Sequence, residues 1–376
     1  MDQEEFSLEA LRSSIKERGA EWEPEETTLS LLTPSERVQR LGLLPTNVEL
    51  GVVTELGLDR PIEKQQTRRR PRKSSNPGAV GLPSKIDWRD YDGKNWTTPI
   101  RDQGACGSCV AFGTVAALEA LLKIRTFKDA GRSVDLSEAH LLFCGGGSCS
   151  GWHMNNACDY LKANGVPDEA CFPYSHGLST RSCTPCSDWR NRIDHTKIPS
   201  WSNTKDVDQM KTRLVQNGPQ ITGMAVYTDF FSYAGGVYEP VSGSLEGYHC
   251  VAVVGYDDDS GCWICKNSWG TGWGEADGGQ RGWFRIKYGE CGIDNAFGMW
   301  DMEVPTLEGS GEAKYLLVDY SFTTKVRTLW AYAGDAWRHR SITDAEVAGI
   351  AKLLMEAGRV HVRWKDGEMT FVRAIK

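Results

Sequence analysis

Residues 103–109 read QGACGSC and stand directly before a stretch, Cys109 to Ile124, that is apolar nearly all round. Such a stretch predicts a buried helix with Cys109 at its N-terminus. There the free N–H groups and the helix dipole stabilise a thiolate, the reactive form of cysteine. The backbone N–H of Cys109 and the amide of Gln103 could donate to an oxygen turning negative above the sulfur. By itself, a CxxC pair fits a redox pair or a structural disulfide equally well.

A histidine and an asparagine further along the chain supply the groups that such a thiol needs. His249 lies in the run GYHCVAVVGY, 140 residues after Cys109, and Asn267 lies in the run WICKNSWGTGWGE. An imidazole can take the thiol proton and hold it as a stabilising cation. Taken singly, a core thiol, a core histidine and a turn asparagine are simpler interpretations. The combination in this order favours a catalytic site.

Two more runs complete the pattern: LPSKIDWRD from Leu82 and GGQRGWFRIKYGECGI after Asn267. With these motifs in this order, the sequence resembles the papain and cathepsin family of cysteine peptidases, from about Leu82 to about Met302. The resemblance implies an α+β, two-lobed papain-like fold with a helical lobe and a β-barrel-like lobe. It also implies a thiol protease that hydrolyses peptide bonds through a thioester acyl-enzyme.

The resemblance gives each matching residue a role. Cys109 would attack the peptide carbonyl, and His249 would take and return the proton. Asn267 would orient the His249 ring, Trp269 would shield this pair from water, and Gln103 would complete the oxyanion hole. The positions implied around the substrate are Gly151, Trp152, Met154, Gly223, Gly247, Cys250, Trp269 and Ala296.

Two positions depart from the family pattern. Val110 follows the nucleophile where the family usually has an aromatic residue, so we expect altered packing with unchanged chemistry. The family's two glycines after the second half-cystine are Gly151 and Trp152 here. Gly151 can still offer its backbone to a substrate strand, whereas we expect the Trp152 ring at the edge of the cleft. The other pocket positions are uncharged, which predicts a large apolar side chain at the second residue before the scissile bond.

The resemblance also implies disulfides among the twelve cysteines. The implied pairs are Cys106–Cys149, Cys144–Cys183 and Cys171–Cys186, the last from the run EACFPY, which resembles a cathepsin C pattern. Three bridges indicate an oxidising compartment, extracytoplasmic or secreted. Zinc at Cys183 and Cys186 is the rival interpretation, although no second ligand pair is suitably spaced. We expect no metal and no cofactor. The expected buried free thiols are Cys158, Cys250, Cys262, Cys265 and Cys291.

The patterns divide the chain into three parts. We expect an N-terminal prosegment and linker over residues 1–81, the peptidase domain over 82–305, and a small C-terminal module over 306–376. The module is predicted as ββαββ after a linker at Glu308–Glu312. Its expected elements are strands at Tyr315–Phe322, Val326–Ala331, Val360–Lys365 and Met369–Ile375, a helix between Thr343 and Gly358, and a hairpin turn at Asp366-Gly367.

The first part combines helix signals, short apolar stretches and a basic run. Leu8, Leu11 and Ile15 predict a helix that Gly19 ends, and the capping box at Thr33–Glu36 predicts a helix over Pro34–Leu41. The stretches Leu29–Leu32 and Leu41–Pro45 are able to cover a cleft. Residues 63–81 carry many Arg, Pro and Gly, which predicts an exposed linker open to proteolysis.

Composition and hydropathy argue against broad nucleic-acid binding and against a membrane span, and they bear on the cellular location. The net charge of −7 argues against broad nucleic-acid binding. No apolar run approaches the ~20 residues that span a bilayer. The N-terminus lacks the basic start and apolar stretch of a secretory signal, so a cytoplasmic location also stays open.

These observations predict a cysteine endopeptidase made as a zymogen, blocked by its own prosegment and acting on proteins or peptides. An exopeptidase and a peptide ligase are alternatives on the same site, since an amine can capture an acyl-enzyme in place of water. An inactive papain-fold binding protein is the third, although the nucleophile, the base and the oxyanion donor are all present.

Overall fold

The computed structural model describes residues 7–62, 82–193 and 195–305, together with six strands between residues 309 and 375. The chain forms two compact units, one of Met1–Lys123 with Ala130–Val304 and one of Ile124–Asp129 with Pro305–Lys376. The expected linker at 63–81, the expected helix at 343–358 and the turn at 366–367 lie outside the described residues.

The first unit contains a ten-stranded mixed sheet of order β1-β5-β9-β7-β6-β4-β10-β3, with β2 on β6 and β8 on β9. Its strands are β1 (Glu21–Pro24), β2 (Lys85–Asp87), β3 (Trp201–Thr204), β4 (Gln220–Tyr227), β5 (Tyr233–Tyr238), β6 (Leu245–Asp257), β7 (Cys262–Lys266), β8 (Glu275–Asp277), β9 (Gln280–Lys287) and β10 (Met299–Met302). The strands β5, β6, β7 and β9 are short runs rich in β-branched and aromatic residues, a composition typical of strands. β4, which holds small and polar residues among the apolar ones, is not predicted.

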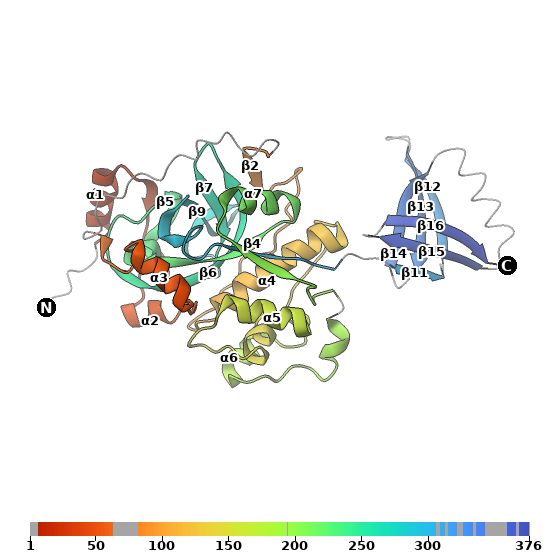
Figure 1. Ribbon diagram of the computed structural model, residues 1–376, viewed down its shortest axis with the longest axis horizontal. Helices are drawn as coiled ribbons and strands as arrows, with labels where there is room; N and C mark the ends of the chain where they lie inside the picture. Colours follow the sequence, from red (N-terminus) through yellow and green to blue (C-terminus); the bar gives the residue numbers. More distant parts are fainter. Residues whose placement is uncertain are drawn as a thin grey trace. The chain divides into compact units, whose positions relative to one another are not determined.

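Helices precede most of these strands along the chain, as an α+β fold requires. They are α1 (Leu8–Arg18), α2 (Pro34–Val38), α3 (Asn47–Glu55), α4 (Cys109–Leu121), α5 (Met154–Asn164), α6 (Tyr174–Thr180) and α7 (Val207–Gln216). Figure 1 shows α4, α5 and α6 together beside the strands β4 and β6. Nearly every residue of α4 is buried, as its apolar sequence predicts. The predicted α+β fold is therefore confirmed, with Cys109 as the first residue of a core helix.

Residues 7–62, here called the N-terminal segment, contain three helices. Gly19 ends α1 in the left-handed conformation, as predicted. The capping box of Thr33 and Glu36 opens α2, which ends at Val38 and so is shorter than expected. The prediction missed α3, although Thr46 and Glu49 form a second capping box at its start.

The N-terminal segment also adds a strand to the sheet. β1 pairs antiparallel with β5, and the buried Trp22 ring of β1 lies 6.2 Å from the Tyr233 ring and 5.3 Å from the Tyr238 ring. Its indole N–H donates to the Glu239 carbonyl at 3.0 Å. Further on, the Thr27 hydroxyl donates to the carbonyl of Phe231 at 2.6 Å. The segment is thus packed on the β-rich part of the unit by backbone pairing and a buried aromatic side chain.

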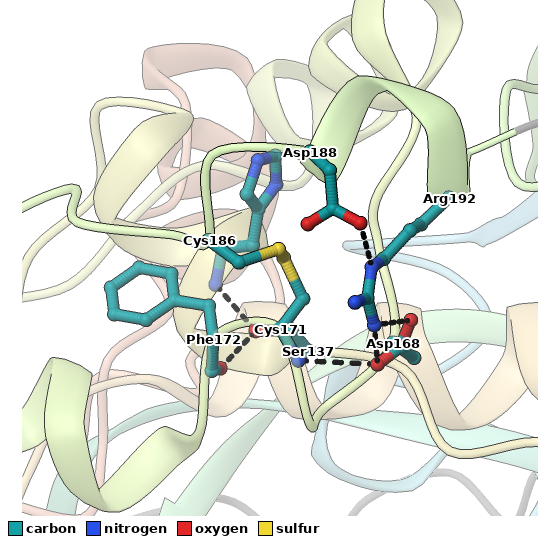
Figure 2. Close-up of a disulfide and its surroundings, with 8 residues drawn as sticks. Ser137, Asp168, Cys171, Phe172, Cys186, Asp188 and Arg192 are labelled. Atoms are coloured by element: carbon teal, nitrogen blue, oxygen red, sulfur yellow. Dashed lines mark hydrogen bonds and ion pairs between the residues drawn. A yellow bond between two sulfur atoms is a disulfide. The ribbon is translucent and has the colours of Figure 1, made fainter.

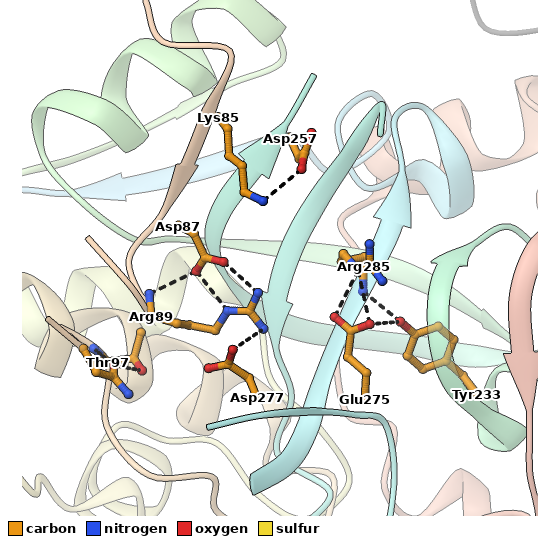
Figure 3. Close-up of polar contacts among 10 residues, drawn as sticks. Lys85, Asp87, Arg89, Thr97, Tyr233, Asp257, Glu275, Asp277 and Arg285 are labelled. Carbon is orange, nitrogen blue, oxygen red and sulfur yellow. Dashed lines mark hydrogen bonds and ion pairs between the residues drawn. The ribbon is translucent and has the colours of Figure 1, made fainter. Parts of the chain in front are cut away.

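Ion pairs hold the first residues of the peptidase domain, around Lys85 to Arg89, against the sheet. Figure 3 shows Lys85 of β2 on Asp257 of β6 at 3.1 Å, across the β2–β6 pairing. Arg89 donates two hydrogen bonds to the Asp87 carboxylate, from Nε at 2.9 Å and from Nη2 at 2.7 Å. Its third nitrogen, Nη1, lies 3.9 Å from the Asp277 carboxylate. A bidentate arginine–carboxylate contact has a fixed geometry, so it orients the chain that leads to residues 103–109.

Three disulfides lie near the helices. They are Cys106–Cys149, Cys144–Cys183 and Cys171–Cys186, the same pairs that the resemblance implies. Because Cys183 and Cys186 each bond another cysteine, the zinc alternative has no thiolates left. Figure 2 shows the third bridge beside Arg192, whose guanidinium contacts the carboxylates of Asp168 and Asp188, each at 3.1 Å.

The second unit contains a six-stranded sheet of order β11-β15-β16-β14-β13-β12. Its strands are β11 (Gly309–Glu312), β12 (Tyr315–Ser321), β13 (Val326–Ala333), β14 (Ala336–Ile342), β15 (Arg359–Lys365) and β16 (Glu368–Ile375). The four predicted strands are present. The ββαββ prediction nevertheless lacks two strands. Its glycines make β11 resemble a linker, and in β14 two arginines and a histidine interrupt the apolar residues, so that no strand is predicted there.

Candidate active site

Cys109 stands at the N-terminal end of α4, directly after the N-cap residue Ser108, and is fully buried. Burial raises the pKa of its thiol to about 11, while the backbone N–H groups of Cys250 and Gly42 act in the opposite direction. A group without contact with water disfavours its charged form. In this state Cys109 is therefore a neutral thiol at physiological pH.

His249 and Asn267 come from the neighbouring strands β6 and β7 and their ends. His249 Nε2 and Asn267 Oδ1 lie 2.7 Å apart, and both side chains are buried. The Trp269 ring lies 4.6 Å from the His249 ring, tilted by 33°. Burial lowers the pKa of His249 to about 4, against the effect of Asn267. The other ring nitrogen, Nδ1, has no hydrogen-bond partner among the described residues.

The Gln103 side chain makes hydrogen bonds with residues from three parts of the first unit. Its amide NH₂ donates to the carbonyl of Cys106 at 2.8 Å and to that of Arg40 at 3.0 Å. Its carbonyl accepts a hydrogen bond of 2.6 Å from the Ser268 hydroxyl. The amide predicted as an oxyanion donor thus already holds a carbonyl oxygen, which the N-terminal segment supplies.

That carbonyl belongs to a stretch, Arg40–Leu44, that lies against the predicted site. Trp152 N–H donates to the Gly42 carbonyl at 2.8 Å, and Leu44 N–H donates to the Trp152 carbonyl at 2.9 Å. Leu43 pairs with Trp152 as a parallel bridge, and its N–H donates to the Tyr248 carbonyl at 3.2 Å. The stretch therefore binds by its backbone, in the manner of an added strand.

Side-chain contacts along Arg40–Leu44 involve several predicted positions. A Cβ built on Gly223 would lie 2.4 Å from Leu43 Cδ2, and one built on Gly247 would lie 3.0 Å from Leu41 Cδ1. Each glycine thus leaves room for a leucine. A Cβ built on Gly42 would lie 1.9 Å from the carbonyl oxygen of Gly107, two residues before Cys109. Only glycine fits at Gly42.

The Trp152 side chain, which we expect at the edge of the cleft, is buried in the covered state. Its ring is buried and lies against Gly145 and Gly147, where built Cβ atoms would approach it to 2.5 and 2.9 Å. The ring is therefore accommodated by two glycines behind the strand, and its backbone stays free to pair with Leu43.

The remaining predicted positions are buried, and some contacts were not predicted. Gly223 of β4 stands opposite Cys250 of β6, while Met154 begins α5 and Ala296 precedes β10. Phe297, which the prediction missed, closes the space next to Leu43, with Cδ1 2.7 Å from a Cβ built on Gly223. Asp102 and His153 were also missed. The His153 Nδ1 lies 2.6 Å from the Leu44 carbonyl. Asp102 directly precedes Gln103 and His153 directly follows Trp152, so their positions beside predicted site residues could have indicated them.

Over the described ranges, no group of three or more His, Cys, Asp or Glu side chains is arranged to hold a metal ion. None of the helices described here has the length and apolarity needed to cross a bilayer.

A sequence model described as "Papain family cysteine protease" matches residues 82–299, more than half of the chain. The chain belongs to the papain family of cysteine proteases. Relatives in this family include "Cysteine proteinase 2" of Entamoeba histolytica, 37% identical over 52% of this chain and 62% of the relative. "Cathepsin K" of Gallus gallus is 32% identical over 64% of this chain and 73% of its own. The chain thus spans less than two thirds of the Entamoeba protein.

Solved structures of papain-family precursors share the fold. Procathepsin B S9 from Trypanosoma congolense is 22% identical with a TM-score of 0.61, covering 81% of this chain and all of its own. Procathepsin L2 from the larval midgut of Tenebrio molitor is 24% identical with a TM-score of 0.57, covering 79% of this chain and 88% of its own. The papain-like fold that the sequence motifs predict is confirmed.

Proposed function

We propose that this protein is a cysteine endopeptidase with Cys109 as nucleophile, His249 as base and Asn267 as the residue that orients the base. The observation that carries the proposal is the hydrogen bond of 2.7 Å between His249 Nε2 and Asn267 Oδ1. The residue after His249, Cys250, has its backbone N–H at the Cys109 thiol, which stands at a helix N-terminus. Asn267 holds one ring nitrogen and leaves Nδ1, which has no partner among the described residues, for the thiol proton.

The proposed reaction has two halves. The Cys109 sulfur adds to the peptide carbonyl while its proton passes to His249, and the oxyanion takes hydrogen bonds from the Gln103 amide and the Cys109 N–H. The imidazolium then protonates the leaving amine as the C–N bond breaks, which leaves a thioester. Water adds to the thioester, gives its proton to His249 and releases the acid and the free thiol.

In the described state, the N-terminal segment acts as an inhibitory prosegment. The backbone N–H of Gly42 lies at the Cys109 sulfur. The Arg40 carbonyl fills the position that an oxyanion would need on Gln103. The stretch Arg40–Leu44 therefore covers the nucleophile and the oxyanion donor together, and a substrate cannot reach either while it is bound.

Substitution of the proposed catalytic residues tests the mechanism. Cys109→Ala should abolish hydrolysis of a fluorogenic peptide amide after cleavage of the chain within residues 63–81. His249→Ala should cost at least 10²–10⁴-fold, as expected for a general base, and Asn267→Ala less. Circular dichroism of each variant provides the folding control. Turnover by a folded Cys109→Ala chain would refute the mechanism.

Leu43 supports the proposed preference for a large apolar side chain at the second residue before the scissile bond. A Cβ built on Gly223 would meet Leu43 Cδ2 at 2.4 Å and Phe297 Cδ1 at 2.7 Å, so the space over Gly223 holds an aliphatic side chain beside an aromatic ring. A peptide library varied at this position should give faster cleavage with leucine than with arginine. Faster cleavage with arginine would contradict the proposal.

Two further aspects of the function are proposals. Transfer of the acyl group to an amine would appear as product masses with an added amine, which separates a ligase from a hydrolase. Three disulfides are typical of an oxidising compartment, so we propose a location outside the cytoplasm.

A further inference from the structure

Asp102 makes an ion pair with the stretch that covers the site. Its Oδ1 lies 2.7 Å from Arg40 Nη1, and the carboxylate is about half exposed while the arginine side chain is mostly buried. Gln103, the next residue, binds the Arg40 carbonyl. One arginine is thus held twice, by its side chain on Asp102 and by its backbone on Gln103.

The order of contacts places Asp102 relative to the scissile bond. Along the stretch, Leu43 lies on Gly223, Gly42 on Cys109 and Arg40 on Asp102. The proposed function assigns the Gly223 side to residues before the scissile bond. Because Cys109 lies between the two, Asp102 lies on the side of the leaving amine.

The Asp102 carboxylate is held in place by the backbone around it. The Gly104 N–H donates to Oδ1 at 2.9 Å, and Asp102 pairs with Trp269 as an isolated antiparallel bridge. A Cβ built on Gly270 would lie 3.2 Å from Oδ2. The neighbouring cation, Arg101, is engaged elsewhere, on Asp135 at 2.5 Å. When Arg40 departs, an oriented anion remains, and none of these contacts depends on Arg40.

We infer that Asp102 is a specificity-determining residue that selects a basic side chain within the first two residues after the scissile bond. This inference rests on the proposed peptidase function and extends it to the substrate class. The ion pair that binds Arg40 in the covered state is replaced by an ion pair with a lysine or arginine of the substrate. An acidic side chain at the same place meets repulsion from the same carboxylate.

The test uses the full chain, cut within residues 63–81 and diluted so that the N-terminal segment dissociates. Peptides that differ only at the first and second residues after the scissile bond carry arginine, leucine or glutamate there. We expect kcat/KM to favour arginine over leucine by about two- to fivefold, the range for a partly exposed ion pair. Glutamate should be the slowest.

Two variants isolate the charge. Asp102→Asn keeps an oxygen for the Gly104 N–H and should remove the preference for arginine, and Asp102→Lys should reverse it in favour of glutamate. A peptidyl coumarin amide, which has no residue after the scissile bond, serves as the internal reference: within each protein, the rates for the arginine, leucine and glutamate peptides are divided by its turnover.

The outcomes separate the two proposals. If the cut chain releases coumarin but cleaves the arginine, leucine and glutamate peptides at equal rates, the role of Asp102 is overturned and the peptidase function stays intact. A preference for arginine that survives in Asp102→Asn also overturns it. If the cut chain does not release coumarin at all, the peptidase proposal fails, and the specificity inference fails with it.

Discussion

Gly42 is the residue at which the covered state is most sensitive to one added methyl group. The Gly107 carbonyl oxygen occupies the place of its missing Cβ, at 1.9 Å, and both partners are backbone that cannot rotate away. Gly42→Ala should therefore dislodge Arg40–Leu44 and raise the activity of the uncut full-length chain by at least tenfold, measured with the coumarin amide.

The control for this variant is Gly51→Ala. Gly51 lies in α3 of the same segment, and a Cβ built there meets nothing within 4 Å. Its alanine variant should keep the low activity of the uncut chain, or lower it slightly by favouring the helix. Equal activity of the two variants would mean that Arg40–Leu44 does not block the site.

His249 makes the binding of the N-terminal segment depend on pH. Burial lowers its pKa to about 4, and exposure on release returns it towards the ordinary value of about 6.5. The covered state therefore has its full stability above pH ~6.5 and loses it as the pH falls towards 4. This shift alone predicts about thirtyfold weaker binding at pH 5 than at pH 7.5.

Calorimetric titration of the cut Cys109→Ser chain with residues 1–62 measures this effect without turnover. The same titration with His249→Asn added should lose most of the pH dependence. An unchanged thirtyfold effect in that double variant would assign the titration to another group. The Cys109 thiol, whose pKa burial raises to about 11, is absent from the Cys109→Ser chain and does not contribute to this titration.

At the residue scale, the sequence predicts site positions where chemistry dictates the residue type, and the structure brings the predicted pair His249 and Asn267 into contact. Cys109, His249, Asn267 and Gln103 stand in runs whose order is distinctive. The position of the Trp152 ring was not readable, because it depends on the space left by Gly145 and Gly147. Asp102 and His153 were missed since a lone charged or polar side chain beside a motif is ordinary in a sequence.

Among the elements, β1 has the clearest energetic role. Trp22 is 3% exposed and packs on Tyr233 and Tyr238, so its loss removes the largest apolar contact of this strand. Trp22→Ala should weaken inhibition of the cut chain by residues 1–62 by at least a hundredfold, since truncating a buried aromatic costs about 3–5 kcal/mol. Leu31→Ala, at a side chain that is 67% exposed, is the matched control and should change inhibition less than twofold.

Element prediction succeeded where local signals are strong and failed where tertiary pairing decides. The capping box of α2 and the apolar face of α1 are local, and both helices are present. β1 has only four residues, with two glutamates, and exists because β5 offers an unpaired edge. β14 likewise needs the neighbouring β13 and β16. No periodicity within such short or charged runs distinguishes them from loops.

At the scale of the whole molecule, the proposed catalytic residues Cys109, His249, Asn267 and Gln103 belong to the first unit. We therefore expect that a chain ending at Pro305, cut within residues 63–81, hydrolyses the coumarin amide with kcat/KM within about twofold of the longer cut chain. Near-ultraviolet circular dichroism would establish that it is folded. A folded but inactive product would assign residues 306–376 a part in the site.

The N-terminal segment and the peptidase domain are joined in one chain through residues 63–81, and this connectivity makes activation a problem of mass action. While the chain is whole, the segment competes at an effective concentration on the order of millimolar, whatever the protein concentration. Once the chain is cut, the same contacts of Trp22, Arg40 and Leu43 face ordinary dilution. Protein cut within residues 63–81 and kept at high concentration should remain inactive. The same protein should become active on dilution alone, without any further chemical change.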